Sequence, residues 1–329
     1  MKSRRHACIA LAFAAAALAA AGSPAAAHAE TYPSRPITVI VPFAAGGTAD
    51  LIARLLAEAA ARQLGQPLII DNRSGGDGTI GAQVAARAKP DGHTLLQIST
   101  GHVILPTLRS DVGYDWQHNF VPVFGATTVP QAIAVSGKSQ IRTTADLAAA
   151  AKAAPKGIDY ASGGAGSISH LTAAYIVHAL NVQATHVAYR GLSNAVQAVR
   201  SDQVLFTVVN IPDVAELVKS GSLRLIAVTS EERLPQFPDV PTLAEQGFKG
   251  WTSSSWSAYL APAKTPPEIL DRLYRAYSAA ASDPDVKERL RQIGVSVQPM
   301  NGNELGSFMR KESNLWRSVI QENQIKLEE

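Results

Sequence analysis

The stretch Ile37-Thr-Val-Ile-Val-Pro-Phe-Ala-Ala-Gly-Gly-Thr-Ala-Asp50 decides the fold. Its β-branched run up to Val41 predicts a short buried strand, which Pro42 ends. The glycine pair leaves the loop backbone uncovered, and Thr48 stands where a helix N-cap is expected. A strand, a bare loop and a helix start together predict an anion site, because the first amides of a helix lack intrahelical partners. A βα turn without a ligand is the alternative.

A second copy of this design favours the binding interpretation. The stretch Tyr160-Ala-Ser-Gly-Gly-Ala-Gly-Ser-Ile-Ser-His170 connects a predicted strand over 158–160 to a predicted helix over 169–180. Two glycine-lined helix starts, more than a hundred residues apart, could face each other across a cleft.

The order of predicted elements indicates an α/β protein. From Pro36 onward strands alternate with helices, which is typical of a parallel sheet covered on both faces. We expect a two-lobed fold, each lobe a mostly parallel sheet flanked by helices, with two crossover strands between them. Residues 30–127 and 253–329 would form a discontinuous first lobe, and residues 128–252 the second. The segment 101–119 is expected to be mostly loop, broken by Pro106.

The first 29 residues form a predicted secretory signal peptide. Lys2, Arg4 and Arg5 precede an apolar run over 9–21, and Ala27-His-Ala29 is a cleavage site. A membrane anchor is the alternative, but Gly22-Ser-Pro24 interrupts the apolar run before it reaches the length of a span. The sequence therefore predicts an exported protein.

The charge balance changes when this leader is set aside. Removing its 3 basic residues from 30 Lys and Arg leaves 27, against 27 Asp and Glu. No basic field then suggests nucleic acid or an anionic membrane surface. The single cysteine, Cys8, belongs to the leader, so no disulfide, thiolate nucleophile or cysteine metal site is expected. The histidines lack metal-ligand spacing, and neither a metal nor a cofactor is expected.

Two motifs suggest other functions more weakly. Gly76-Asp-Gly-Thr-Ile-Gly81 matches a dinucleotide fingerprint, but no acidic residue ends the next strand, which favours a helix-opening turn near the cleft. Ser162 and Ser167 beside His170 leave open a secreted α/β hydrolase. That alternative lacks the Gly-x-Ser-x-Gly elbow and an acid to orient the histidine, so no catalytic residue is expected.

The stretch Pro42-Phe-Ala-Ala-Gly-Gly-Thr-Ala-Asp50 resembles the first motif of the Bug, or TctC-like, periplasmic solute receptors. Further motifs similar to those of the family follow in order at 72–82, 88–96, 160–171, 186–191, 227–230, 238–247 and 261–266. The resemblance covers nearly all of the chain after the leader. It implies a receptor, not an enzyme, that captures a small carboxylated solute between two lobes and delivers it to membrane subunits of a tripartite tricarboxylate transporter. A ligand sensor for a signalling partner is the alternative, and we expect a monomer.

In the family, two βα loops hold the ligand carboxylate through backbone amides. The ligand-binding residues that the resemblance implies here are Phe43, Ala44, Ala45, Gly46, Gly47, Thr48, Asp50, Ser99, Ser162, Gly163, Gly164, Gly166, Ser167, His170 and Asn210. Leu205 and Val209 stand where the family tends to be more polar. They suggest an apolar far end of the pocket, and hence a hydrophobic or aromatic carboxylate.

Overall fold

The computed structural model describes residues 32–322 and Ile325. The chain divides into two units, Met1–Ser34 and Arg35–Glu329, and all elements named below belong to the second. The expected signal peptide lies outside the described residues. No helix within the described part of the chain is long and apolar enough to cross a membrane.

The first lobe is built on a parallel three-stranded core. Strand β1 (Ile37–Val41) pairs in parallel with β2 (Leu68–Asn72) on one side and with β3 (Thr94–Ser99) on the other. Four helices follow these strands along the chain: α2 (Thr48–Leu64), the short 3₁₀ helix η1 (Gly76–Gly78), α3 (Thr79–Ala86) and α4 (Thr100–Leu108). The burial of β1, which is fully buried at Ile37, Val39 and Val41, explains its β-branched sequence.

The second lobe repeats this arrangement. Strand β5 (Ile158–Ser162) pairs in parallel with β6 (Ala184–Ala188) and β7 (Phe206–Asn210). The rest of the lobe comprises α5 (Thr144–Ala153), α6 (Ile168–Ala179), α7 (Leu192–Arg200), α8 (Ile211–Lys219), β8 (Leu223–Val228) and the 3₁₀ helix η2 (Ala244–Gln246).

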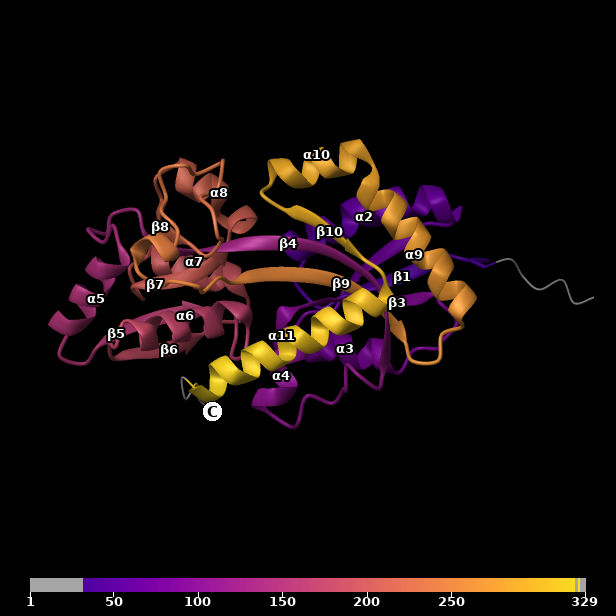
Figure 1. Cartoon of the computed structure of the whole chain (residues 1–329), viewed down its shortest axis with the longest axis horizontal. Helices are drawn as coiled ribbons and strands as arrows, with labels where there is room; N and C mark the ends of the chain where they lie inside the picture. Colours follow the sequence, from indigo (N-terminus) through magenta and orange to yellow (C-terminus); the bar gives the residue numbers. More distant parts are fainter. Residues whose placement is uncertain (1–31, 323–324, 326–329) are drawn as a thin grey trace, which may run out of the picture. The chain divides into compact units, whose positions relative to one another are not determined.

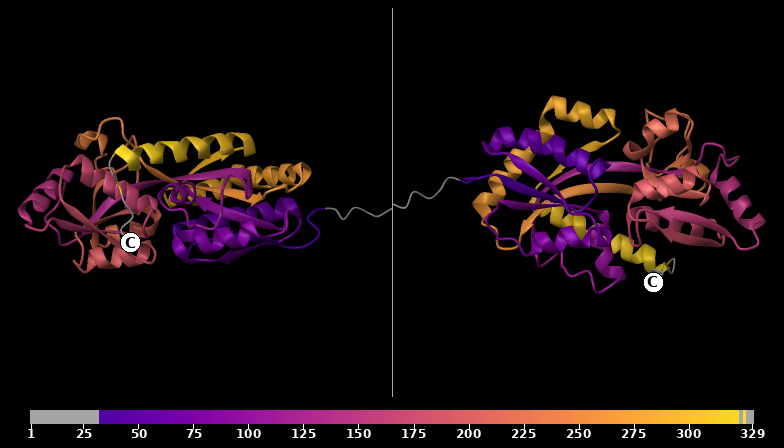
Figure 2. Two further views of the ribbon diagram at one scale, coloured as in Figure 1. Left: turned by 90° about the horizontal axis from the view of Figure 1, so that it is seen from below. Right: turned by 180° about the vertical axis from the view of Figure 1, so that it is seen from behind.

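Two antiparallel strands cross between the lobes, as Figures 1 and 2 show. Strand β4 (Phe120–Ser136) pairs with β9 (Ser254–Pro262) as far as Pro130, and from Gln131 onward it pairs with β7. The chain ends with α9 (Pro267–Ser282), α10 (Pro284–Gln292), β10 (Ser296–Met300) and α11 (Gly302–Glu322). Strand β10, which the sequence did not predict, pairs with β4, and α11 packs on β4 and α4. The expected two-lobed α/β fold is confirmed.

One expected loop is a helix. The segment from Thr100 to Leu108 forms α4, although Pro106 lies inside it. A proline removes the hydrogen bond to the carbonyl four residues earlier, which is that of His102. The hydroxyl of Tyr114 donates to this carbonyl at 2.9 Å and so satisfies it. A tertiary contact therefore preserves a helix that the local sequence disfavours.

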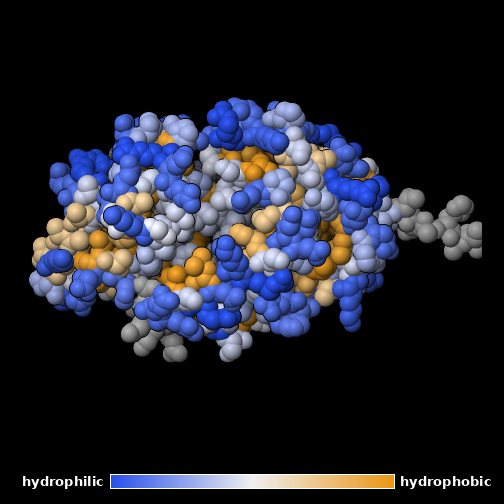
Figure 3. Space-filling model, in the orientation of Figure 1, coloured by the Kyte–Doolittle hydropathy of each residue, from blue (hydrophilic) through white to orange (hydrophobic). Residues whose placement is uncertain are grey.

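The basis for an apolar end of the pocket fails, because Val209 and Leu205 pack in or against the core of the second lobe. Val209 is fully buried in the second lobe, where it packs with Ala132, Val199 and Val214. Leu205 packs against a second core cluster that includes Phe206 and Tyr160. Both side chains stabilise the core, so they carry no information about the ligand. In the view of Figure 3, polar residues cover most of the surface and apolar patches lie between them.

Candidate functional site

Four helices begin at one place between the two lobes. They are α2 and α4, which follow β1 and β3, and α6 and α8, which follow β5 and β7. The amide of Thr48 at the start of α2 donates to Asp213 in the first turn of α8 at 3.0 Å. A methyl group added at Gly101 in α4 would lie 3.9 Å from the carbonyl oxygen of Gly166, which precedes α6. The positive ends of four helix dipoles therefore point into one region, which favours an anion.

The first glycine loop, residues 43–50, is braced by one carboxylate. Asp50 is 4% exposed, and it accepts hydrogen bonds from the Gly46 amide at 2.9 Å and from Asn72 at 3.0 Å. It also pairs with Arg54 at 2.9 Å. Burial alone would raise the pKa of Asp50, but the bonds from Arg54, Gly46 and Asn72 outweigh it and hold the pKa below its usual value. Asp50 therefore shapes the loop as a fixed anion.

Gly47, not Thr48, is the N-cap of α2, and no side chain caps this helix. The expected capping role of Thr48 is wrong, because its hydroxyl donates across the cleft to Asp213 at 2.6 Å. The loop residues Ala44, Ala45 and Gly46 are exposed, and Phe43 and Gly47 are partly exposed. The amides of Ala49 and Asp50 belong to the first turn, where helix geometry provides no intrahelical partner. The first loop thus presents a helix start that only a group from outside the helix can complete.

That group is Asp213. One carboxylate oxygen accepts from the amide and hydroxyl of Thr48, and the other accepts from the Asn210 side chain at 3.1 Å. No cation is among the groups that bind it in the described part of the chain. Burial raises the pKa of the Asp213 carboxyl, while the bonds from Thr48 and Asn210 oppose that rise. Asp213 was not among the residues expected from the sequence.

The second glycine loop, residues 162–170, satisfies its own amides. The amide of Gly163 donates to Ser169 Oγ at 3.1 Å, and that of Gly164 donates to Ser162 Oγ at 3.2 Å. The amide of Gly166 donates to His170 Nδ1 at 3.1 Å. These glycine amides are therefore engaged within the loop. The N-cap Ser167 accepts from the amide of His170 at 3.3 Å, so the donors that helix geometry leaves at this end are the first-turn amides of Ile168 and Ser169.

A stack of rings supports this second loop. The His170 and His186 rings are 3.8 Å apart between centroids, and Tyr160 stacks on His186 at 5.2 Å. Burial lowers the pKa of His170 to about 3, with a further contribution from His186. Burial also lowers the pKa of His186 to about 4. Both rings are neutral at pH 7, so they act as packing surfaces, and His170 Nδ1 accepts from the Gly166 amide.

The serine–histidine contacts here are structural. Ser162 is fully buried, lies 2.7 Å from His186 Nε2, and donates to the carbonyl of Gly164 at 2.9 Å. Ser167 donates to the same carbonyl at 2.7 Å. Both hydroxyls thus hold the loop closed on itself. His186, like Asp213, was not expected at the site, although the family motif at 186–191 begins with it and it lies two residues from the end of β6.

The remaining expected residues, Ser99 and Asn210, end β3 and β7 and are the N-caps of α4 and α8. Ser99 contacts His102, whose ring packs edge-on against Phe43. Burial lowers the pKa of His102 to about 4. The ligand-binding residues expected from the sequence thus all lie at or just after the carboxyl ends of β1, β3, β5 and β7, where α/β sheets bind ligands.

The Gly76–Gly81 motif forms η1 and the start of α3, as the expected helix-opening turn. Its Asp77 reaches the other lobe, where its carboxylate lies against Gly164 so closely that a side chain added there would meet it. Burial raises the pKa of Asp77, and Arg109, 3.7 Å away, opposes the rise. Each lobe therefore places one carboxylate against the glycine loop of the other.

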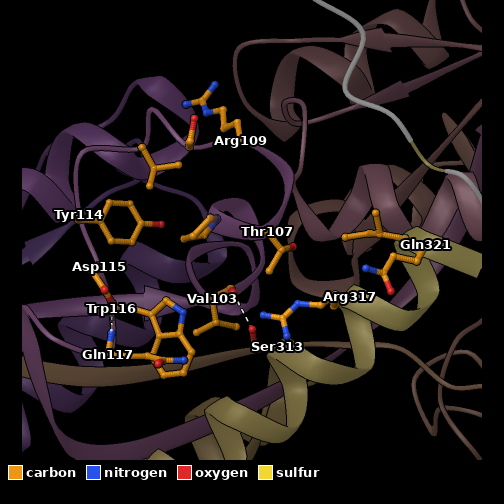
Figure 4. Close-up of a pocket in the computed structure, with 14 residues that line it drawn as sticks. Val103, Thr107, Arg109, Tyr114, Asp115, Trp116, Gln117, Ser313, Arg317 and Gln321 are labelled. Carbon is orange, nitrogen blue, oxygen red and sulfur yellow. Dashed lines mark hydrogen bonds between the residues drawn. The ribbon is translucent and has the colours of Figure 1, made fainter.

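A separate cavity of about 430 Å³ lies outside this cleft, on the first lobe. Figure 4 shows Arg317 and Gln321 of α11 on one side of it, Tyr114 and Trp116 on the other, and Thr107 between them. Ser313 ties α11 to the carbonyl of Val103 at 3.2 Å. No group of three or more potential metal-binding side chains occurs within the described residues.

A cleft that is made by helix starts from two lobes, with two strands crossing between them, defines the class of two-lobed solute-binding proteins. The chain belongs to the tripartite tricarboxylate transporter family receptors, whose model matches residues 52–325. It is therefore a solute receptor and not an enzyme.

Solved structures agree with this assignment. The periplasmic binding protein BugD is 32% identical, with a TM-score of 0.84 over 90% of this chain and 99% of its own. Rpa4515 of R. palustris with adipate is 31% identical, with a TM-score of 0.85 over 90% of this chain and 99% of its own. MatC of Rhodopseudomonas palustris with bound malate is 31% identical, with a TM-score of 0.82 over 88% of this chain and all of its own.

Proposed function

We propose that this receptor captures a small organic carboxylate between its lobes and delivers it to the membrane subunits of a tripartite tricarboxylate transporter. The observation that carries the proposal is the convergence of the α2, α4, α6 and α8 starts, because four helix dipoles favour a negative charge there. The relatives with bound adipate and malate support the same ligand class. The leader at residues 1–29 supports export to the periplasm, where the receptor would act as a monomer.

In this proposal the carboxylate meets neutral donors. The α2 end offers first-turn amides beside Thr48, and the α6 end offers the amides that follow Ser167. Of the arginines near the site, Arg54 pairs with Asp50 and Arg109 lies beside Asp77. A small anion that bridges both lobes would have differential affinity for their closed arrangement, which would couple binding to closure.

A thermal-shift screen tests this function. Purified protein is heated with mono- and dicarboxylates, including adipate and malate, and with the uncharged diamides of the same acids as matched controls. A ligand at 100 times its Kd stabilises the native state by about 2.7 kcal/mol, which raises the melting temperature measurably. We expect a rise with at least one carboxylate and none with its diamide. If no carboxylate raises the melting temperature, or if the diamides act equally well, the proposal is wrong.

A further inference from the structure

We propose that Asp213 is an internal occupant of the anion site, a carboxylate of the protein that takes the position of the ligand's carboxylate at the start of α2. The inference rests on the proposed function and extends it to selectivity. Every ligand that uses the amide and hydroxyl of Thr48 must displace a carboxylate that the protein itself supplies.

The contacts of Asp213 are those of a bound anion. Its oxygens accept from a helix N-terminal amide at 3.0 Å, from the hydroxyl of the same residue at 2.6 Å and from an amide side chain at 3.1 Å. This is the donor set that a free carboxylate finds at a helix start. Thr48 and Asp213 belong to different lobes and are 165 residues apart, so these bonds also connect the lobes.

The side chains at the start of α8 make this interaction instead of capping their own helix. Asn210 is the N-cap of α8, yet its side chain donates to Asp213 and makes no capping bond. An acid in the first turn normally stabilises its own helix dipole while facing water. Here the carboxylate instead extends to the opposite lobe, where Gly47 leaves the start of α2 without a side-chain cap.

An internal occupant has a definite effect on selectivity. Because Asp213 is tethered, its effective concentration at Thr48 is high, and a competing ligand loses affinity in proportion. A ligand with a single weak contact cannot displace it. A ligand with further polar groups that reach the α6 start or Ser99 can compensate for that loss. Asp213 therefore selects against simple monocarboxylates.

The experiment measures the lobe separation and needs no knowledge of the ligand. Spin labels are attached at Glu58→Cys in α2 and Gln197→Cys in α7, both at exposed positions, with Cys8→Ser to leave two cysteines. Double electron–electron resonance then compares the parent protein with Asp213→Ala. Glu216→Ala is the matched control, because Glu216 lies on the same helix and its side chain is 84% exposed.

We expect Asp213→Ala to move the main distance to longer separations and Glu216→Ala to leave it unchanged. Formate, added as a free carboxylate, should restore the short distance in Asp213→Ala, whereas chloride at equal ionic strength should not. If the distances of Asp213→Ala equal those of the parent protein, Asp213 does not occupy the site. If the lobes separate but formate has no effect beyond that of chloride, Asp213 is only a tie between lobes and the inference is overturned.

A second variant secures the test against a folding defect. Asp213→Asn keeps the shape of the side chain and one acceptor for Thr48 but removes the charge, so a partial shift to longer distances is expected, and no shift overturns the inference. Circular dichroism checks that each variant is folded. Because these measurements use formate as the only probe, their failure leaves the carboxylate screen unaffected, and a failed screen does not alter the distances.

Discussion

The two glycine loops have similar sequences but hold their backbones in opposite ways. In the first loop the Asp50 carboxylate accepts a hydrogen bond from the Gly46 amide. Asp213 of the other lobe accepts from the Thr48 amide at the start of α2. The second loop turns its glycine amides inward onto Ser162, Ser169 and His170. A glycine-rich sequence therefore permits an exposed helix start but does not ensure free amides. Side chains that follow the loop decide whether the amides remain available.

The largest expected difference between the loops appears on acidification. His170 and His186 have pKa values of about 3 and about 4 in the folded protein, below the 6.5 of an unperturbed histidine. The unfolded chain therefore binds more protons below pH 6.5, so their contribution to stability is complete above 6.5 and is lost as the pH falls towards 4. Asp50 has a lowered pKa, so its contribution to stability is lost only below the ordinary aspartate pKa of 3.8.

Urea unfolding between pH 7 and pH 4.5 measures this difference. For His170, which is 2% exposed, the expected loss at pH 4.5 is on the order of 2–3 kcal/mol. The double variant His170→Gln/His186→Asn should show a smaller loss over the same range, whereas Asp50→Asn should keep the slope of the parent protein. Equal slopes for the parent protein and the double variant would contradict the neutral-ring support of the second loop.

A smaller effect distinguishes the glycines themselves. Gly164 has φ of +141°, a conformation that side chains rarely adopt, and an added methyl group would meet Asp77. Gly47 has φ of −83°, and the nearest atom to an added methyl group is the Ala44 carbonyl oxygen at 3.8 Å. We expect Gly164→Ala to cost about 1–3 kcal/mol of unfolding free energy and Gly47→Ala less than about 1 kcal/mol.

Chemical denaturation of both variants at pH 7 gives the two values side by side. Gly164→Ala should recover part of its loss when combined with Asp77→Ala, since the removed carboxylate leaves space for the methyl group. Equal losses of unfolding free energy for Gly164→Ala and Gly47→Ala would contradict the difference in backbone conformation between these two glycines.

Part of this site follows from the sequence alone. The β-branched run before Pro42 and the glycine pair after it predict β1 and its loop, and the second copy predicts β5 and the approach to α6. These features are local, and periodicity together with turn residues determines them. The two-lobed order follows from the alternation of elements and from the family motifs.

The rest depends on contacts that no local pattern contains. Helix α4 survives Pro106 because Tyr114, eight residues further on, satisfies the carbonyl of His102. Thr48 is not a cap because its hydroxyl donates a hydrogen bond to Asp213, which lies 165 residues away in the sequence. The engagement of the Gly163, Gly164 and Gly166 amides depends on side-chain rotamers within the folded loop. The expectation for these two residues fails because Val209, inside β7, faces the core, and Leu205, just before β7, packs against the core.

The smallest expected effect is that of a substitution in the first loop that raises stability but weakens ligand binding. Gly47→Ser introduces a side-chain N-cap where α2 has none, and serine at an N-cap exceeds glycine by a few tenths of a kcal/mol. The new hydroxyl would accept from the amide of Ala49 or Asp50, the same first-turn donors that a bound carboxylate would use. The variant should therefore unfold at a slightly higher urea concentration while binding its carboxylate more weakly.

Calorimetric titration measures the Kd of Gly47→Ser for the carboxylate that most raises the melting temperature. Gly65→Ser is the matched control, because Gly65 ends the same helix at its far end with φ of +74° and lies outside the cleft. It should lower stability through its backbone conformation and leave the Kd unchanged. If Gly47→Ser binds as tightly as the parent protein, the anion does not rest on the first-turn amides of α2. The comparison would then favour the α6 start of the second loop as the main source of donors.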